Sequence, residues 1–370
     1  LDVQCKTPSL LGKWMPSENT SSVKTKKTAA KVRKFIGMTP KQYRKTLSVL
    51  RTRINVLERL MSEGRWDEIE FDKLPSKAGF IYKNAFARHD IERAKSEKNV
   101  MTYEQFAKDT TTTVNAKTLY PYECVAEVMK HISFGWSYRN NFNITATERA
   151  MINKYWDNLA DYIQGATFNG IAVVDTSGSM FDAWGADRNV ASIEVAVSLG
   201  LYVAERNNGI FKNQMITFSQ RPNFITVDDK WSLYDKVKHV ERADWGMNTD
   251  LEAVFNLVLN AAVKANIPAE EMPEAIVIIS DMQFDQCTYN RDCLGMIRGK
   301  YEAAGYKCPK LVFWNASARA NCSKPITRDK TGTVLVGGCK PGMFEQVLAA
   351  KSPEAFMTDI LNGERYSVLN

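Results

Sequence analysis

The stretch Ile171–Met180 constrains the fold of this chain more than any other. Four apolar residues, mostly β-branched, run directly into Asp175 and then into a loop of small residues. A short apolar run that ends in a polar loop is typical of a buried central strand in a parallel sheet. Asp175, Ser177 and Ser179 alternate with small residues, so one carboxylate and two hydroxyls can converge on one point. Hard oxygen donors of this kind suit Mg²⁺ or Mn²⁺ and suit Zn²⁺ poorly.

Two further polar loops are expected at the same edge of the sheet. The apolar strand 275–280 leads into Asp281, and the segment 246–250 contains Thr249 and enters a helix. From residue 168 onward strands alternate with helices, which predicts a doubly wound α/β sheet whose ligands bind beyond the carboxyl ends of the strands. Mg²⁺ prefers about six oxygen ligands, so open positions would remain for a partner's carboxylate or phosphate. The candidate metal ligands are Asp175, Ser177, Ser179, Thr249 and Asp281.

The part of the chain before residue 165 has apolar residues at helical spacing and no strand pattern, so we expect an all-α array there. The clearest element is a helix from Lys41 to about Ser62, whose apolar residues form one stripe. A shorter helix is expected over 29–37 and a long one over 76–98. Trp14 lies in a polar segment without regular structure and is expected to pack against a neighbour.

The net charge of +7 is concentrated in the same N-terminal part. Residues 1–165 contain 28 Lys and Arg against 18 Asp and Glu, whereas the remainder contains 21 against 24. A basic excess of this kind indicates a polyanionic partner. A solvated basic face is the plainer interpretation, and contact with RNA phosphates is the sharper one. Tyr43 or Trp14 could stack on bases, although core packing is favoured for both. The best-placed cations are Lys24, Lys27, Lys31, Lys34, Arg44, Lys45, Arg51 and Arg53.

Several classes of protein are disfavoured by what the sequence lacks. It contains no apolar run of about 18 residues and no secretory signal, so neither a membrane span nor secretion is expected. Seven cysteines without a CxxC pair favour a reducing, cytoplasmic setting, and three dispersed histidines disfavour a zinc site. The chain begins at Leu1 rather than at methionine, as a processed product or a fragment would.

Catalysis is not expected either. No histidine lies near the serines in the sequence, and neither Gly-x-Ser-x-Gly nor a phosphate-binding GxxxxGK[ST] loop is present. Metal-assisted hydrolysis is chemically conceivable. Serine and threonine ligands with open positions describe a docking site at least as well, so we expect a protein that is not an enzyme.

The three-loop set closely resembles the metal-ion-dependent adhesion site of von Willebrand factor A domains. In that family Asp175, Ser177 and Ser179 would be the ligands of the first loop, Thr249 that of the second and Asp281 that of the third. A basic all-α region followed by an A domain resembles the Ro autoantigen (TROVE) family. There a ring of helical repeats is closed by an A domain and binds structured and misfolded small RNAs. This chain lacks part of that helical region, which puts a closed ring in doubt.

A closer resemblance is to an uncharacterised family of plant and large-virus proteins with the same layout. It rests on recurring segments of this chain, namely 13–19, 43–44, 74–78, 86–90 and 280–285.

The predicted organisation is a polar extended segment at 1–22, a basic all-α helical region at 23–165, a von Willebrand factor A domain at 166–365 and a tail at 366–370. Two functions compete for it. One is a non-enzymatic, Ro-like protein whose helices bind RNA and whose Mg²⁺-dependent A domain closes or docks. The other is a scaffold or virion assembly protein whose metal site docks an acidic residue of a protein partner. No membrane partner is expected, and the sequence does not fix the RNA, the protein partner or the oligomeric state.

Overall fold

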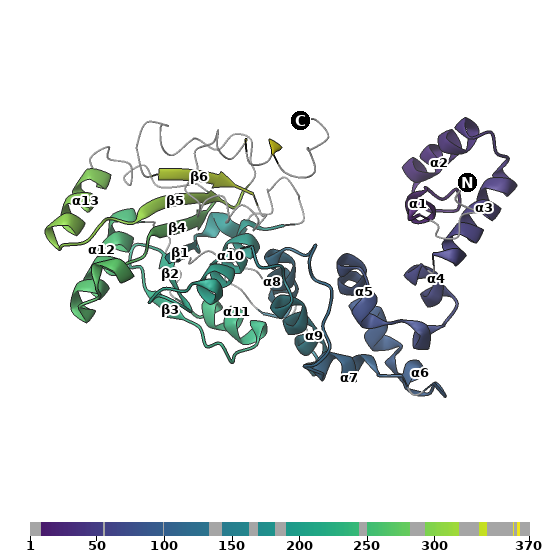
Figure 1. Ribbon diagram of the computed structural model, residues 1–370, viewed down its shortest axis with the longest axis horizontal. Helices are drawn as coiled ribbons and strands as arrows, with labels where there is room; N and C mark the ends of the chain where they lie inside the picture. Colours follow the sequence, from purple (N-terminus) through teal and green to yellow (C-terminus); the bar gives the residue numbers. More distant parts are fainter. Residues whose placement is uncertain are drawn as a thin grey trace. The chain divides into compact units, whose positions relative to one another are not determined.

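The computed structural model shows the chain as two compact units, Leu1–Thr112 and Thr113–Asn370 (Figure 1). The structure describes residues 9–54, 56–98, 100–132, 143–162, 169–181, 190–243, 250–281, 293–317, 333–338, 358 and 361–362.

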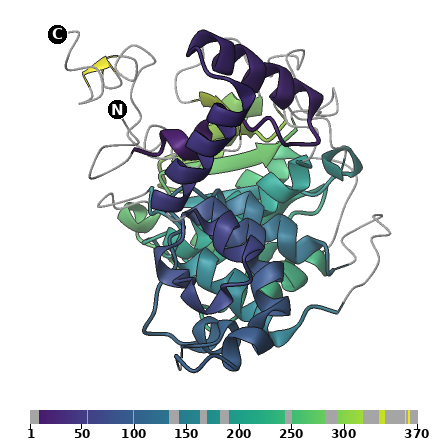
Figure 2. The same ribbon diagram turned by 90° about the vertical axis from the view of Figure 1, so that its right-hand side faces the viewer.

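Every regular element described in the first unit is a helix, which confirms the predicted all-α array (Figure 1, Figure 2). The helices are short because proline, glycine and polar residues interrupt the apolar periodicity every few turns. They are α1 (Leu11–Trp14), α2 (Val23–Phe35), α3 (Pro40–Arg53), α4 (Leu57–Ser62), α5 (Ser76–Arg88), α6 (Asp90–Ala94) and α7 (Tyr103–Lys108), with 3-10 turns η1 (Trp66–Glu68) and η2 (Phe71–Lys73).

The prediction of one helix from Lys41 to Ser62 is wrong. Thr39 caps α3 as expected, since its hydroxyl accepts from the Gln42 N–H while the Gln42 side chain accepts from the Thr39 N–H. However, α3 ends at Arg53, and Val56 has extended backbone angles (φ −63°, ψ 131°) before α4 begins. The segment between the helices is rich in β-branched residues, which disfavour helix, and its asparagine has a low helix propensity. The apolar stripe is therefore divided between two helices.

Arg93 of α6 joins the turn η1 to the segment that precedes α7. Its guanidinium is buried and donates to the carbonyl oxygens of Met101 (2.6 Å), Trp66 (2.6 Å) and Ile69 (2.9 Å). It also lies 4.3 Å from the ring centroid of Phe71, which is a cation–π contact. Burial lowers the pKa of the Arg93 guanidinium. One side chain thus satisfies carbonyl groups on two separate segments, the turn η1 with the residue after it and the segment before α7.

The second unit is built on a six-stranded sheet with helices on both faces, as the sequence predicts (Figure 1). The strand order is β3-β2-β1-β4-β5-β6, and every pairing is parallel except that of β2 with β3. The strands are β1 (Gly170–Asp175), β2 (Gln214–Phe218), β3 (Phe224–Thr226), β4 (Ala275–Ser280), β5 (Lys310–Asn315) and β6 (Thr333–Gly337). The helices are α8 (Pro121–Met129), α9 (Ala146–Asp157), α10 (Ser192–Arg206), α11 (Leu233–Glu241), α12 (Leu251–Ala265) and α13 (Cys293–Ala303), with turns η3 (Gly178–Phe181) and η4 (Ala269–Glu271).

The central strand β1 is buried on both faces. Ile171 and Val173 belong to the apolar core that α12 and α13 cover. On the opposite face α10 approaches so closely that a Cβ built on Gly200 would lie 2.4 Å from Cγ2 of Val174. Only glycine permits this approach, so Gly200 helps to fix the height of β1 and of the loop that follows it.

Helices α8 and α9 pack within the second unit rather than with α1 to α7. Trp156 of α9 donates its indole N–H to Glu205 of α10 (2.9 Å), and Lys236 of α11 pairs with the same carboxylate (2.9 Å). The compact units consequently divide after Thr112, and the domain boundary after residue 165 stays a prediction from the sequence. The tail predicted at 366–370 lies outside the described residues. No helix within the described ranges is both long and apolar enough to cross a membrane.

Candidate metal centre and nucleic-acid interface

The oxygen donors of the first and third loops meet at the carboxyl edge of the sheet. Asp175 is the last residue of β1 and Ser280 is the last of β4, and the two strands are paired in parallel up to Val174 and Ile279. The chain leaves β1 for β2 on one side, while β4 lies on the other. This is the switch point of a doubly wound sheet, where ligands bind.

Asp175 is fully buried, and its two carboxylate oxygens are held by different loops. Oδ1 accepts the backbone N–H of Ser177 at 2.9 Å, and Oδ2 accepts the hydroxyl of Ser280 at 2.6 Å. The hydroxyl oxygens of Ser177 and Ser179 lie 3.2 Å apart. Asp175, Ser177 and Ser179 thus lie close together at this edge, and their role as metal ligands stays a prediction.

The third loop is joined to the first by a contact of Met180. Asp281 is buried, and its backbone N–H lies 3.1 Å from Sδ of Met180, in the turn η3. Its negative charge is near enough to raise the pKa of Asp175. Thr249 lies outside the described residues, so its part in the site stays a prediction. The next residue, Asp250, caps α12 by accepting the Ala253 N–H at 3.0 Å.

Burial raises the pKa of Asp175 to about 6, although the Ser280 and Ser177 hydrogen bonds act against this shift. Two buried carboxylates at one edge are costly without a cation nearby. The donors are hydroxyl and carboxylate oxygens, and no group of three His, Cys, Asp or Glu gathers anywhere in the described part of the chain. This donor set fits a hard divalent cation such as Mg²⁺ or Mn²⁺ and does not fit Zn²⁺.

Ser280 is a residue of this site that the sequence analysis did not single out. It contributes a hydrogen bond that fixes the Asp175 carboxylate. The available signal was its position, since it ends the strand that neighbours β1.

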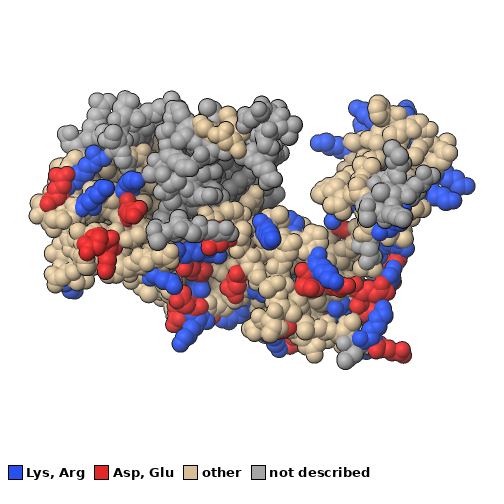
Figure 3. All heavy atoms as spheres, in the orientation of Figure 1, with Lys and Arg blue, Asp and Glu red and all other residues tan. Residues whose placement is uncertain are grey.

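The first unit concentrates positive charge on α2 and α3. Residues 23–53 contain eleven Lys and Arg and no Asp or Glu. In the view of Figure 3, the charged residues visible where α2 and α3 lie are mainly blue. Seven of the eight predicted cations are exposed, namely Lys24, Lys27, Lys31, Lys34, Arg44, Lys45 and Arg53.

Arg51 differs from those seven and has a structural role. Its guanidinium donates to the carbonyl oxygens of Gly12 (3.0 Å) and Met15 (2.9 Å) and to the hydroxyl of Ser17 (2.9 Å). These bonds tie the segment before α2 to α3, and they direct the charge inward. We therefore leave Arg51 out of the proposed phosphate-binding surface.

The two aromatic residues considered for base stacking have different positions. Tyr43 is buried, packs with Ala29 and Leu47, and donates its hydroxyl to the carbonyl of Pro16 (2.8 Å), so core packing is confirmed. Trp14 is 77% exposed, and the expectation that it packs against a neighbour is wrong. It is the last residue of α1, a single helical turn that is too short to cover it.

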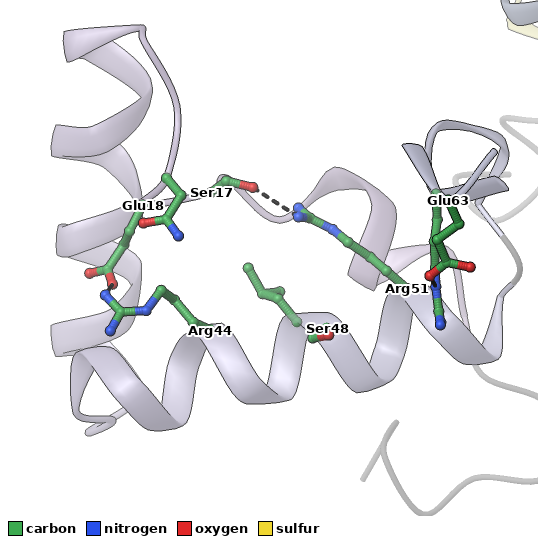
Figure 4. Close-up of a pocket in the computed structure, with 9 residues that line it drawn as sticks. Ser17, Glu18, Arg44, Ser48, Arg51 and Glu63 are labelled. Carbon is green, nitrogen blue, oxygen red and sulfur yellow. Dashed lines mark hydrogen bonds and ion pairs between the residues drawn. The ribbon is translucent and has the colours of Figure 1, made fainter. Parts of the chain in front are cut away.

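Two other features of the first unit were not foreseen. Phe35, the last residue of α2, is 92% exposed. A polar pocket of about 320 Å³ lies between the segment 17–19, α3 and α4 (Figure 4). The only sequence signal for the pocket was the recurring segment 13–19, which forms part of its wall.

The mostly parallel sheet of this strand order, with helices on both faces, gives the second unit the α/β fold of von Willebrand factor A domains. An all-α unit precedes it. Residues 169–364 match the family model DUF7788 and residues 9–167 match DUF2828, each described as a domain of unknown function. The first match covers more than half of the chain, so this protein belongs to the DUF7788 family.

A similar protein is uncharacterized protein L728 of Acanthamoeba polyphaga mimivirus. It is 33% identical over 371 residues, which cover 95% of this chain. The chain spans only 60% of that relative's length. The match supports the predicted resemblance to a large-virus family.

Among solved structures, the Deinococcus radiodurans RO (RSR) protein is similar at 11% identity and a TM-score of 0.43, over 92% of this chain and 72% of that one. The SpRpn10 VWA domain is similar at 12% identity and a TM-score of 0.30, over 51% and 96%. Manganese-loaded Plasmodium vivax TRAP protein is similar at 12% identity and a TM-score of 0.30, over 50% and 72%. At these values the likenesses say nothing of what this chain binds.

Proposed function

We propose that this protein is a non-enzymatic RNA-binding protein whose helices α2 and α3 contact RNA phosphates. The observation that carries the proposal is the run of eleven cations without one acidic residue between 23 and 53. Phosphate contacts release condensed counterions and account for most sequence-independent affinity for nucleic acid. A surface of one sign over two consecutive helices is suited to this kind of contact.

The arrangement on α2 favours binding over a merely solvated face. Lys24, Lys27, Lys31 and Lys34 follow one another at spacings of three or four residues, so each lies beside the next on the helix surface. Like charges at these spacings destabilise a helix by about 0.2–0.5 kcal/mol per pair. Intervening acidic residues would remove this repulsion, and α2 has none. A bound polyanion relieves it instead.

Exposed aromatic side chains in the same unit favour unpaired RNA. Trp14 and Phe35 expose most of their surface to solvent, and Phe35 directly follows Lys34. Aromatic faces beside cations stack on bases that are not engaged in a duplex. We therefore expect single-stranded regions to bind more tightly than duplexes.

For the A domain we propose a divalent-cation site used in docking. Asp175, Ser177, Ser179 and Asp281 would hold Mg²⁺ or Mn²⁺, with Thr249 as the expected further ligand. A bound cation would supply open coordination positions for a carboxylate from a partner. This site favours a second candidate function, a scaffold that docks an acidic residue of another protein. The two functions use different surfaces, and one protein can have both.

The RNA proposal is tested by fluorescence anisotropy with a labelled single-stranded oligoribonucleotide. Salt is varied from about 50 to about 200 mM, a range over which the affinity of a protein with many phosphate contacts falls by roughly 10³-fold or more. The variant changes Lys24, Lys27, Lys31 and Lys34 to Gln. We expect it to bind more weakly and to reduce the slope of log K against log salt by about 3, since each single-strand phosphate contact contributes about 0.7.

The matched control changes four exposed lysines of the second unit, Lys212, Lys230, Lys264 and Lys307, to Gln. It removes the same charge and should retain most of the affinity. Equal losses in the two variants would show that net charge alone attracts the RNA and would overturn the proposed surface.

Chelation separates the two functions. RNA binding should persist in EDTA, whereas docking of an acidic protein partner should be lost in EDTA and in Asp175→Ala. A partner that still binds Asp175→Ala in EDTA contradicts metal-dependent docking.

A further inference from the structure

The charged side chains at one end of the pocket in the first unit are fully paired with each other, and those at the other end are not. At one end Arg59 pairs with Glu63 at 2.6 Å, and Arg65 donates to the other oxygen of the same carboxylate at 2.8 Å. At the other end Glu18 faces Arg44 (Figure 4). These two side chains are oppositely charged, yet their closest atoms, Oε2 of Glu18 and a terminal nitrogen of Arg44, are 3.9 Å apart. That distance is too long for a hydrogen bond.

Glu18 is held in place and keeps one oxygen available. Its Oε1 accepts from Nε of Arg33 at 2.7 Å, which fixes the carboxylate. Its Oε2 is buried and has no hydrogen-bond partner. A buried acceptor left unpaired costs about 1–3 kcal/mol, more when it is charged. A ligand that donates a hydrogen bond to this oxygen therefore gains affinity.

Arg44 offers donors beside this acceptor. It is about half exposed, and its ion pair with Glu18 is long. Ser48 lies between the two ends on α3 (Figure 4). Leu47, the residue before it, also forms part of the pocket wall. Arg51 holds Ser17 and so fixes the opposite wall. The pocket is thus a donor fork next to a carboxylate acceptor, on a wall that is partly apolar.

This pairing of charges selects the kind of ligand. A phosphate or carboxylate would be repelled by Glu18, and an ammonium group would be repelled by Arg44. The ligand needs neighbouring acceptors for Arg44 followed by neighbouring donors for Glu18. Guanine has this order along its adjoining Hoogsteen and Watson–Crick edges, with N7 and O6 as acceptors and then N1–H and N2–H as donors.

The other bases do not present two neighbouring acceptors followed by two neighbouring donors. Uracil places a second acceptor, O2, beyond its single N–H, where it would face the carboxylate. Adenine alternates acceptor, donor and acceptor. Cytosine has two neighbouring acceptors, O2 and N3, but only one donor atom beyond them, N4, so it lacks the second donor that guanine offers to Glu18. A volume of about 320 Å³ is at the lower limit for small-molecule sites and suits a single base.

We propose that this pocket binds one unpaired guanine of the RNA, with Arg44 donating to O6 and N7 and Glu18 accepting from N1–H and N2–H. The inference rests on the proposed RNA binding and adds base selectivity to it. Because both edges of the base are engaged, the guanine must be outside a duplex.

The test compares labelled oligoribonucleotides made of uridines with one central guanosine, adenosine or inosine, measured by anisotropy with the full chain. A good bidentate contact discriminates between bases by a factor of about five or more. We expect the guanosine oligomer to bind at least about fivefold more tightly than the adenosine oligomer. Inosine, which lacks the N2 amino group, should fall between them.

Two variants assign the selectivity to the pocket. Arg44→Gln and Glu18→Gln should each bring the guanosine-to-adenosine ratio close to one. Glu18→Gln also weakens the contact with Arg33, so Arg44→Gln, at a half-exposed position, serves as the variant that leaves the fold intact. Lys41→Gln removes one exposed charge from the same helix outside the pocket and should leave the ratio unchanged.

The outcomes separate this inference from the proposed function. Equal, salt-dependent binding of the guanosine and adenosine oligomers overturns the guanine pocket and leaves RNA binding in place. A guanosine preference that survives Arg44→Gln also overturns the pocket. If no oligomer binds in a salt-dependent manner, both proposals fall.

Discussion

Replacing Asp175 by Asn should stabilise the metal-free protein and abolish its response to Mg²⁺. In the fold Asp175 is fully buried, and burial raises its pKa from 3.8 to about 6. A carboxyl group with a raised pKa binds its proton more tightly when folded than when unfolded. Its contribution to the free energy of unfolding is therefore full at low pH and is lost as the pH rises from about 4 through about 6.

The size of the effect follows from the same values. A difference of about 2 pKa units corresponds to about 3 kcal/mol lost at neutral pH. Asn carries no charge and can still accept the Ser177 N–H, but the Ser280 hydroxyl must turn to accept from the amide. That change costs about 1 kcal/mol. The free energy of unfolding of metal-free Asp175→Asn should then exceed that of the wild type by about 2 kcal/mol at pH 7.5, and the two should differ little at pH 4.

The measurement is urea unfolding, once in EDTA and once in Mg²⁺. Unfolding is monitored by amide hydrogen exchange of peptides from β1 and β4, so that only the second unit is observed. Mg²⁺ at a hundredfold excess over its Kd should stabilise the wild type by about 2.7 kcal/mol and leave the variant unchanged. Asp157→Asn is the matched control. Burial also raises the pKa of Asp157, but this residue lies in α9, away from the carboxyl edge of the sheet.

Two results would refute the reasoning. If wild type and Asp175→Asn unfold at the same urea concentration in EDTA at pH 7.5, the buried charge has no cost and the pKa argument fails. If Mg²⁺ stabilises Asp175→Asn as much as the wild type, the metal is bound elsewhere. Asp157→Asn should keep the full Mg²⁺ response.

Two further substitutions test the scaffold around the sites. Gly200→Ala should destabilise the second unit by about 1–3 kcal/mol, because its Cβ would lie 2.4 Å from Cγ2 of Val174. Thermal unfolding measures this loss of stability, and an unchanged Tm would contradict the close approach of α10. Arg93→Met should destabilise the first unit by about 2–4 kcal/mol, because three carbonyl groups lose a charged donor. Limited proteolysis of the first unit measures this loss, and resistance equal to the wild type would show that solvent replaces the guanidinium.

The strands and the doubly wound alternation of strands and helices were predictable because the apolar runs are unambiguous. The run Ile276–Ile279 and the run Ile171–Val174 contain too many β-branched residues and too few polar ones for a surface helix. The polar residues that end them are placed by the sheet itself, so Asp175 and Asp281 were found from local pattern alone.

What escaped prediction depends on contacts between segments far apart in the sequence. Arg51 belongs to the same basic pattern as Arg44, and only the position of the segment 12–17 turns its charge inward. The exposure of Trp14 depends on how little of the chain lies over α1. The break after Arg53 shows the other difficulty, since an unbroken apolar stripe is compatible with one helix or with two.

Because α8 and α9 pack on the A domain, the border of the compact unit differs from the border between the two family matches. The two family models meet between residues 167 and 169, yet Trp156 and Lys236 share the carboxylate of Glu205 across that border. An A domain excised at the border would expose Tyr202, whose hydroxyl donates to Ala160 at 2.9 Å, and would leave Glu205 with only part of its partners. An A domain that begins at this border would therefore lack α8 and α9, two helices that pack against its α10 and α11.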